Sequence, residues 1–443
     1  MAEADPALLV ELEAEVGAGH PDRACEAALT ILTAHGSPFD VLHAAARGTS
    51  SRLVPGSREP PHDLAALASA AGLQPILGDR NRALAVLQAV ALAASGPKNP
   101  DAIPPPILVR GDVSHLGRSA LLAARRGDLA EAESLFLGIV KEGAERRQAG
   151  DMLFRAALED LGDSGHKLTV VVQAWRLAEA LRFRDARLLL RPAVRYLVRG
   201  ERDRGHSESM LAVLGREWVD LEALAGNARP LGDGDRETLA AVLAAVSPEA
   251  CVEGMLSLLR DGIAPTSLAD GIVVETAKRA LVAEGASLEP AHGLLFAHAA
   301  RFVLTFSRTG ERGYAVFLAA LRCRSPAPRL PIVRVSETDT EEATLRTIQE
   351  EVEAQRPAGA VAHTRGYLSR GFSPKRLVET LAGLAVMDSS LANEGHPLAL
   401  AEACASAYAA TNAPELLMAL AKLLAASPRD DAAATAWSAR LGL

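Results

Sequence analysis

The sequence predicts an all-α, multi-helical bundle. Alanine and leucine dominate a composition that is 49% hydrophobic but only 4% aromatic. Both residues lose little side-chain freedom in a helix. Runs of β-branched residues are rare, and apolar residues recur with the helical period along most of the chain. Proline- and glycine-rich breaks separate these periodic segments. An α-solenoid of helical hairpins is the alternative arrangement.

Segments of the first half are separated by Ser-, Pro- and Gly-rich loops at 49–62 and 96–106. Pro21 belongs to the first turn of a helix, where its missing N–H costs nothing. Ser114 is a candidate cap for a helical hairpin whose pattern resembles a tetratricopeptide hairpin. The predicted helices lie at 5–17, 21–34, from 37 to the first loop, 63–73, 80–95, within 113–143 as the hairpin, 150–161, 165–181, 184–190, 192–199 and 206–225.

The second half opens after a linker at 226–236, and 324–335 is a candidate extended segment or short strand. Thr338 or Thr340 is expected to cap the next helix, whose first turn is rich in carboxylates that suit the positive helix end. The other predicted helices lie at 236–246, 249–260, 267–284, 289–307, 357–369, 374–387, 397–411, 413–426 and 430–440. With 443 residues, we expect halves 1–225 and 226–443 to pack as one globular unit.

Charge and cysteine usage exclude several classes of protein. The net charge of −8 argues against nucleic-acid binding, which needs a basic surface. No apolar run approaches the roughly 18–20 residues that span a bilayer, so no membrane partner is expected. The N-terminus lacks the basic and apolar parts of a signal peptide, which predicts a cytoplasmic protein. The four cysteines show no CxxC spacing, so neither a disulfide framework nor a zinc knuckle is expected. The excess of arginine over lysine is typical of a GC-rich bacterial genome.

Histidines are the main candidates for chemistry, because three in the first half recur in the same order, with similar surroundings, in the second. The offset between partners shrinks from the first pair to the third, as loop shortening would cause. This predicts an internal duplication with a pseudo-two-fold centre. The pairs are His43 in VLHAAARG with His298 in LFAHAARF, His115 in HLGRSALLAARRG with His363 in HTRGYLSRGF, and His166 in DSGHKLTVVVQA with His396 in NEGHPLALAEA.

Neutral imidazole binds iron, zinc, copper or nickel, so these six histidines are predicted metal ligands. We expect His166 and His396 to face each other, with His43 or His298 completing the site. His292 lies off the apolar stripe of His298 and is the weaker candidate. A core histidine bonded to a carbonyl, or one near a helix start, is the alternative explanation for each position. No HExxH motif, phosphate-binding loop, dinucleotide fingerprint or serine-hydrolase elbow is present.

Four arginines, Arg184, Arg187, Arg191 and Arg195, follow helical spacing, although Pro192 interrupts them. A solvated helix face explains this stripe. The alternative is a site for an anion or an acidic protein partner, because guanidinium groups pair well with carboxylates.

The segments HAAAR, GHKLTVVVQAWRLAEAL, RPAVRYL and GHPLALAEA resemble the questin oxidase-like family and related bacterial histidine-rich helical domains. The resemblance covers about a third of the chain. It implies an all-helical, non-haem iron oxygenase whose metal is held mainly by histidines, with a lysine near one of them. Here Lys167 directly follows His166, and neighbouring residues of a helix do not share a face. Lys167 is therefore a doubtful counterpart of that lysine.

Two functions remain open from the sequence. One is a metal-dependent oxygenase or oxidase, with iron as the expected metal and a small apolar or aromatic substrate between leucine- and phenylalanine-lined helices. The other is a helical repeat scaffold for protein–protein interaction, in which the histidines are structural. The enzyme requires the histidines to converge, whereas the scaffold allows them to scatter.

Overall fold

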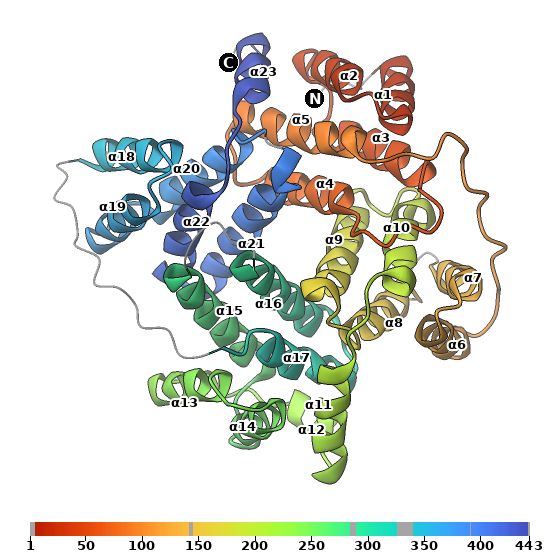
Figure 1. The fold of residues 1–443 in the computed structure, drawn as a ribbon, viewed down its shortest axis with the longest axis vertical. Coiled ribbons are helices and arrows are strands. Elements are labelled where there is room, and N and C mark those ends of the chain that lie inside the picture. Colours follow the sequence, from red (N-terminus) through yellow and green to blue (C-terminus); the bar gives the residue numbers. More distant parts are fainter. Residues whose placement is uncertain (1–4, 141–144, 284–288, 326–339, 390, 442–443) are drawn as a thin grey trace.

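The chain folds into a multi-helical bundle in a computed structural model that describes residues 5–140, 145–283, 289–325, 340–389 and 391–441 (Figure 1). No β-strand occurs among these described residues, and an isolated parallel bridge joins Arg229 to Ile263. The predicted all-α class is confirmed. Most of the segment predicted as extended, 326–335, lies outside the described residues.

The first half of the chain contains helices of five to 17 residues, joined mostly by short loops. They are α1 (Pro6–Ala18), α2 (Pro21–Thr33), α3 (Pro38–Ser51), α4 (His62–Leu73), α5 (Asp79–Ser95), α6 (Val113–Arg126), α7 (Leu129–Ile139), α8 (Glu145–Leu158), α9 (His166–Ala180), α10 (Ala186–Arg199), α11 (Gly205–Arg216) and α12 (Leu221–Ala225), with a 3₁₀ turn at Asp163–Gly165.

The second half continues with helices of similar lengths. They are α13 (Asp233–Leu243), α14 (Pro248–Arg260), α15 (Pro265–Val282), α16 (Glu289–Phe306), α17 (Tyr314–Arg322), α18 (Glu341–Glu353), α19 (Pro357–Ser369), α20 (Pro374–Val386), α21 (His396–Thr411), α22 (Pro414–Ala426) and α23 (Ala432–Arg440), with 3₁₀ turns at Gly310–Gly313 and Leu391–Asn393.

Most helix starts follow the local signals in the sequence, but the predicted cap Ser114 is wrong, because Asp112 caps α6 by accepting from the His115 N–H and Ser114 lies inside the helix. Proline occupies one of the first two positions of α2, as expected. The Thr340 side chain accepts a hydrogen bond from the Ala343 N–H at the start of α18, which confirms Thr340 as the cap. The predicted hairpin is formed by α6 and α7, which pack on each other. It turns through Gly127 and Asp128, and Asp128 caps α7.

Several elements differ from the prediction. Helix α17 was not predicted, and the helix predicted at 150–161 is α8, which begins at Glu145 and ends at Leu158. Two further differences have a clear local cause. A single helix, α10, runs through Pro192, although the proline removes one amide donor from the helix. The predicted helix 206–225 is instead two helices, α11 and α12. The Asp220 side chain accepts from the N–H groups of Glu222 and Ala223 and so starts α12 anew.

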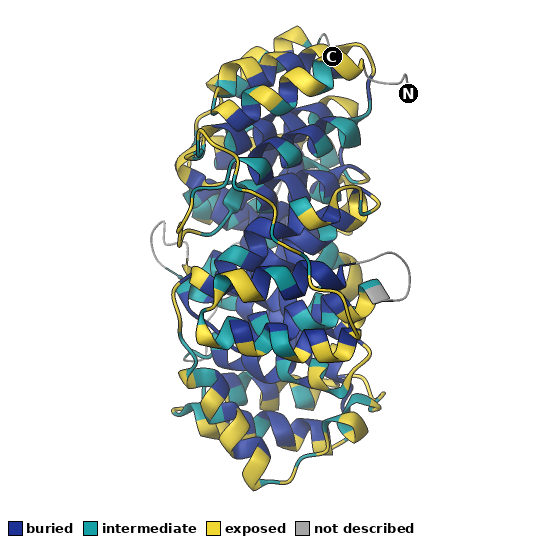
Figure 2. Ribbon diagram, turned by 90° about the vertical axis from the view of Figure 1, so that its right-hand side faces the viewer, coloured by how far each residue is buried: buried dark blue, intermediate teal, exposed yellow. Residues whose placement is uncertain are grey.

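Four helices meet at the centre of the bundle, two from each half of the chain (Figure 1). Helix α4 packs on α9 and α21, and α16 packs on the same two helices. Buried residues run continuously through the middle of the molecule, and exposed residues gather at its outer helices (Figure 2). The core consists mainly of alanine and leucine, whose small and regular side chains allow helices to approach closely. Among the described residues, no helix has the length and apolar character needed to cross a membrane.

Candidate metal centre

Two turns of the same form place His166 and His396 at the first positions of α9 and α21. Each histidine follows a glycine in the left-handed region, Gly165 at φ 83° and Gly395 at φ 77°. A side chain is strained in this conformation, so glycine is the residue that suits it. The chain turns sharply there, and each imidazole points away from its helix start toward the centre of the bundle.

A backbone carbonyl three residues earlier orients each of these imidazoles. The Nδ1 atom of His166 lies 2.6 Å from the carbonyl oxygen of Asp163. The Nδ1 atom of His396 lies 2.9 Å from the carbonyl oxygen of Asn393. A carbonyl only accepts, so Nδ1–H is the donor in both rings. In the neutral imidazoles, each Nε2 therefore presents a lone pair to the centre.

His62 and His292 complete a cluster of four histidines. His62 is the first residue of α4, and His292 lies in the first turn of α16. The Nε2 atoms of His62 and His166 are 3.2 Å apart. Those of His292 and His396 are 3.1 Å apart. Each pair is separated by 104 residues along the chain. We call His62, His166, His292 and His396 the four-histidine cluster.

Three of the four histidines lie close enough to share one ion, and His292 adjoins them. Ligand nitrogens of His62, His166 and His396 all lie within 4.8 Å of one another. The ring centroids of His166 and His292 are 4.6 Å apart, and those of His166 and His396 are 6.0 Å apart. The expected approach of His166 and His396 is thus present. The positions expected for His43 or His298 are taken by His62 and His292.

Carboxylates lie behind the two histidines that lack a carbonyl partner. Glu394 Oε2 is 3.4 Å from Nδ1 of His62. Glu289 Oε2 is 3.9 Å from Nδ1 of His292, and that nitrogen is buried without a hydrogen bond. Such outer carboxylates orient a ligand imidazole and increase its basicity.

Burial keeps these imidazoles neutral. It lowers the pKa of His62 to about 3, and the neighbouring His396, His166 and His292 add to the effect. Burial also lowers the pKa of His292 to about 3, followed by the effects of His166 and His396. The pKa of His396 is lowered mainly by burial. These rings are therefore unprotonated at neutral pH, which is the form that binds metals.

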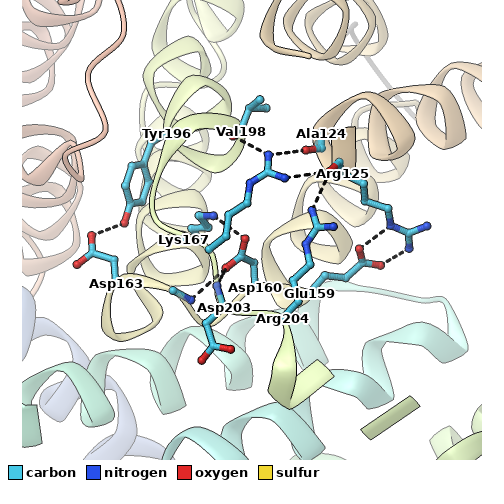
Figure 3. Close-up of polar contacts among 12 residues, drawn as sticks. Ala124, Arg125, Glu159, Asp160, Asp163, Lys167, Tyr196, Val198, Asp203 and Arg204 are labelled. Atoms are coloured by element: carbon cyan, nitrogen blue, oxygen red, sulfur yellow. Dashed lines mark hydrogen bonds and ion pairs between the residues drawn. The ribbon is translucent and has the colours of Figure 1, made fainter. Parts of the chain in front are cut away.

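A buried ion pair supports the turn before His166 (Figure 3). Lys167 is fully buried, and its Nζ donates to Asp160 Oδ2 at 2.6 Å. The other oxygen of Asp160 accepts from the backbone N–H groups of Gly162 and Asp203. The Tyr196 hydroxyl donates to Asp163 Oδ2 at 2.6 Å, next to the carbonyl that holds His166. Lys167 thus points away from the cluster and anchors the turn.

The turn before His396 has a similar anchor without a lysine. Asp388 is buried, and its Oδ2 accepts from the Asn393 side-chain amide at 2.7 Å. Its Oδ1 accepts from the backbone N–H of Asp430 at 3.3 Å. In both turns a buried aspartate therefore connects the histidine turn to a loop from later in the chain.

His298 lies on the same helix as His292 but in another polar group. Its Nε2 is 3.9 Å from Glu402 Oε2, and its Nδ1 has no partner. Glu402 binds Arg176 through both carboxylate oxygens. Burial lowers the pKa of His298 to about 4, against the opposing effect of Glu402. Arg176, His298 and Glu402 come from α9, α16 and α21 and form a second buried layer between these helices.

The remaining predicted ligands lie elsewhere. His43, on α3, contacts Asp185 through Nε2 at 3.1 Å. His115 is exposed near the start of α6. His363, on α19, is half-buried, and its Nδ1 has no hydrogen-bond partner. Of the six predicted histidines, the structure brings His166 and His396 into the four-histidine cluster.

Each arginine of the stripe contacts a partner within the protein, although two of the four are exposed. Arg187 donates to the carbonyls of Leu137 and Val140. Arg191 is buried and donates to Glu133 and two loop carbonyls, and Arg195 also binds Glu133. Arg184 and Arg187 are both exposed, and Arg184, with 47% of its side chain exposed, pairs with Asp40. These contacts leave little of the stripe for an acidic partner.

A repeated motif marks the two histidines that the sequence analysis did not select. The motif is EPPH at 59–62 and EPAH at 289–292. His292 follows His62 by as many positions as His396 follows His166, so one register relates both pairs. The first motif ends a segment with the composition of a loop. The second lies near His298, which has the more apolar surroundings and was therefore selected in place of His292. The constant offset between the two pairs, together with the repeated motif, would have identified both His62 and His292 from the sequence.

A pocket of about 360 Å³ adjoins the cluster on the side of His62. His62 and Glu394 form part of its wall, together with the apolar side chains of Leu53, Leu92 and Leu391. His62 therefore belongs to both the cluster and the pocket.

No protein-family model matches this chain, and neither a curated protein nor a solved structure shows significant similarity to it.

Proposed function

We propose that the four-histidine cluster binds one divalent transition-metal ion and that the protein is a metal-dependent oxidoreductase. The observation that carries the proposal is the convergence of Nε2 atoms at 3.1 and 3.2 Å. An ion with bonds of about 2.0–2.1 Å to nitrogen holds neighbouring ligand atoms about 2.9–3.4 Å apart, the lower value in octahedral coordination, which leaves positions open beside four imidazoles, and the higher in tetrahedral coordination. The observed separations suit such an ion.

The protonation of the pair His62–His166 gives a second reason. Because Nδ1–H of His166 donates to a carbonyl, its Nε2 has a lone pair. If His62 Nε2 carries a proton, its Nδ1 lone pair faces the carboxylate of Glu394 at 3.4 Å. If Nδ1 carries the proton instead, two lone pairs face each other at 3.2 Å. A cation between the Nε2 atoms removes this conflict, because both lone pairs then bind it.

The ligand set narrows the chemistry. Four neutral imidazoles suit iron, zinc, copper or nickel, and they leave the charge of a divalent ion uncompensated by any directly bound carboxylate. Such an ion, when bound, polarises a substrate oxygen or takes part in redox chemistry. Iron and an oxygenase or oxidase activity are the expectation from the resemblance to the questin oxidase-like family.

The test is metal content and metal binding of the purified full-length protein. We expect about one equivalent of a transition metal by elemental analysis, or one equivalent of Co²⁺ bound by the metal-free protein with the visible absorption of nitrogen ligation. Variants His62→Ala and His292→Ala should lose this binding while their far-ultraviolet helix signal persists. If wild type binds no stoichiometric transition metal by either measurement, the histidines are structural and the scaffold function stands.

A further inference from the structure

The two sides of the four-histidine cluster are built from corresponding positions with different residues. The register that relates His62 to His292 and His166 to His396 also relates Ala66 to Phe296. In the same register, Leu92 corresponds to Arg322. These last two pairs decide how much space lies next to each histidine turn.

Contacts of the two glycines show that the residues correspond in space. A Cβ on Gly165 would lie 2.5 Å from the ring of Phe296. A Cβ on Gly395 would lie 2.9 Å from the Cβ of Ala66 and 3.0 Å from Leu92. Phe296 and Ala66 therefore pack against equivalent turns. The ring of Phe296 fills the space next to the His166 turn, whereas the small side chain of Ala66 leaves space next to the His396 turn.

Arg322 occupies the side of His292. Its Nε donates to the carbonyl oxygen of Ser164 at 2.9 Å, and its Nη1 lies 2.7 Å from Glu289 Oε1. Ser164 Oγ also donates to Glu289 at 3.2 Å. On the opposite side, Leu92 stands in place of the arginine and lines the pocket.

We propose that the metal is reached from the His62 side alone, and that the pocket between Leu92 and Leu391 receives a small neutral molecule with a metal-binding oxygen and an apolar, ring-sized body. This inference rests on the proposed metal site and adds its direction of access and its ligand class. The volume of about 360 Å³ admits a small aromatic molecule.

The charges of the pocket wall favour a neutral ligand. Lys98 Nζ donates to Thr49 at 2.7 Å and lies 3.5 Å from Asp63. The Arg52 guanidinium donates to a backbone carbonyl, and Arg195 pairs with Glu133. The three cations of the wall are matched by three carboxylates, Glu59, Asp63 and Glu394, so the wall has no net charge to attract an anionic ligand.

The probe is benzohydroxamate, whose two oxygens bind metals, compared with acetohydroxamate, which lacks the ring. Each is titrated into the Co²⁺-loaded full-length protein and followed by the visible absorption of Co²⁺. We expect benzohydroxamate to bind at least tenfold more tightly, because its ring packs against Leu53, Leu92 and Leu391 of the pocket wall. Equal affinities would overturn the assignment of the ligand class.

Two variants test the direction of access. Leu92→Arg introduces the residue that closes the other side, and Leu391→Trp fills the rim, where Leu391 is 48% exposed. Leu122→Arg, on the exposed face of α6 and outside the pocket, is the matched control. We expect the Co²⁺ affinity of wild type in Leu391→Trp and in the control, and at least tenfold weaker benzohydroxamate binding to the Co²⁺-loaded protein in the first two variants only.

Each failure has its own signature. If Leu92→Arg and Leu391→Trp bind benzohydroxamate as wild type does, the ligand enters elsewhere and the inference is wrong, although the metal site stands. If wild type does not bind Co²⁺, the proposed function fails first and the inference falls with it.

Discussion

His62 and His166 meet through Nε2 atoms 3.2 Å apart, and the proton of His166 is committed to Nδ1 by the carbonyl of Asp163. Whether this contact is favourable therefore depends on whether a proton or a metal cation lies between the two Nε2 atoms. Replacing His62 by alanine removes one of four proposed ligands. We expect the affinity for Co²⁺ or Zn²⁺ to fall by more than the roughly 10–100-fold that follows loss of an outer partner. His43→Ala, on α3, is the control and should bind metal normally. Competition with a chromophoric chelator measures both.

Glu394 orients His62 from behind, with Oε2 at 3.4 Å from Nδ1. Glu394→Gln keeps the shape but removes the negative charge. We expect metal affinity to fall about 10–100-fold, since the imidazole loses its outer carboxylate. Glu253→Gln, an exposed position on α14, should change nothing. An unchanged affinity in Glu394→Gln would show that the carboxylate does not act on the ligand.

Lys167→Met leaves the carboxylate of Asp160 buried without its cation. Breaking such a pair costs about 3–5 kcal/mol, so the urea midpoint should fall clearly. Adding Asp160→Asn removes the stranded charge and keeps an oxygen for the N–H groups of Gly162 and Asp203. The double variant should therefore recover most of the lost stability. A double variant as unstable as Lys167→Met alone would contradict this account.

His298 makes the stability of the metal-free protein depend on pH. Its pKa is about 4 in the folded protein, mainly because of burial, and about 6.5 in the unfolded chain. Above pH 6.5 the ring is neutral in both forms, and its contribution to stability is complete. As pH falls from 6.5 to 4, only the unfolded chain takes up the proton, so up to about 3 kcal/mol is lost. Urea unfolding at pH 7 and pH 5 should show the decline, and His298→Phe should reduce it. Equal slopes in the two proteins would exclude His298 as the cause.

Most of the helices, though not α17, were predictable because their signals are local. Pro21 and Thr340 mark helix starts through effects that reach only a few residues. The break between α11 and α12 was missed because apolar periodicity continues across it, whereas the cap at Asp220 acts through a single side chain. Periodicity likewise does not report whether a helix continues through Pro192.

The cluster was predictable only in part. His166 and His396 carry a local signal, a glycine turn before an apolar helix. His62 reads as the end of a loop, and its burial arises from contacts with α9 and α21, which lie far along the chain.

The predicted internal duplication stays a prediction. The register common to the two histidine pairs of the cluster supports it. This register pairs His62 with His292, whereas the sequence analysis paired His43 with His298. In that register His43 corresponds to Val273, and His298 corresponds to Ala68.

Each half of the chain supplies two imidazoles to the centre, and this division gives the ion a role in cohesion. Neither half alone holds more than two of the four ligands, so an ion bound by all four acts as a cross-link between distant parts of the chain. Its binding energy then adds to the cohesion of the halves, by about 2.7 kcal/mol when free ion exceeds Kd a hundredfold. Two fragments produced by cutting the chain within residues 226–232 would, on this basis, reassociate more tightly with the ion than without it.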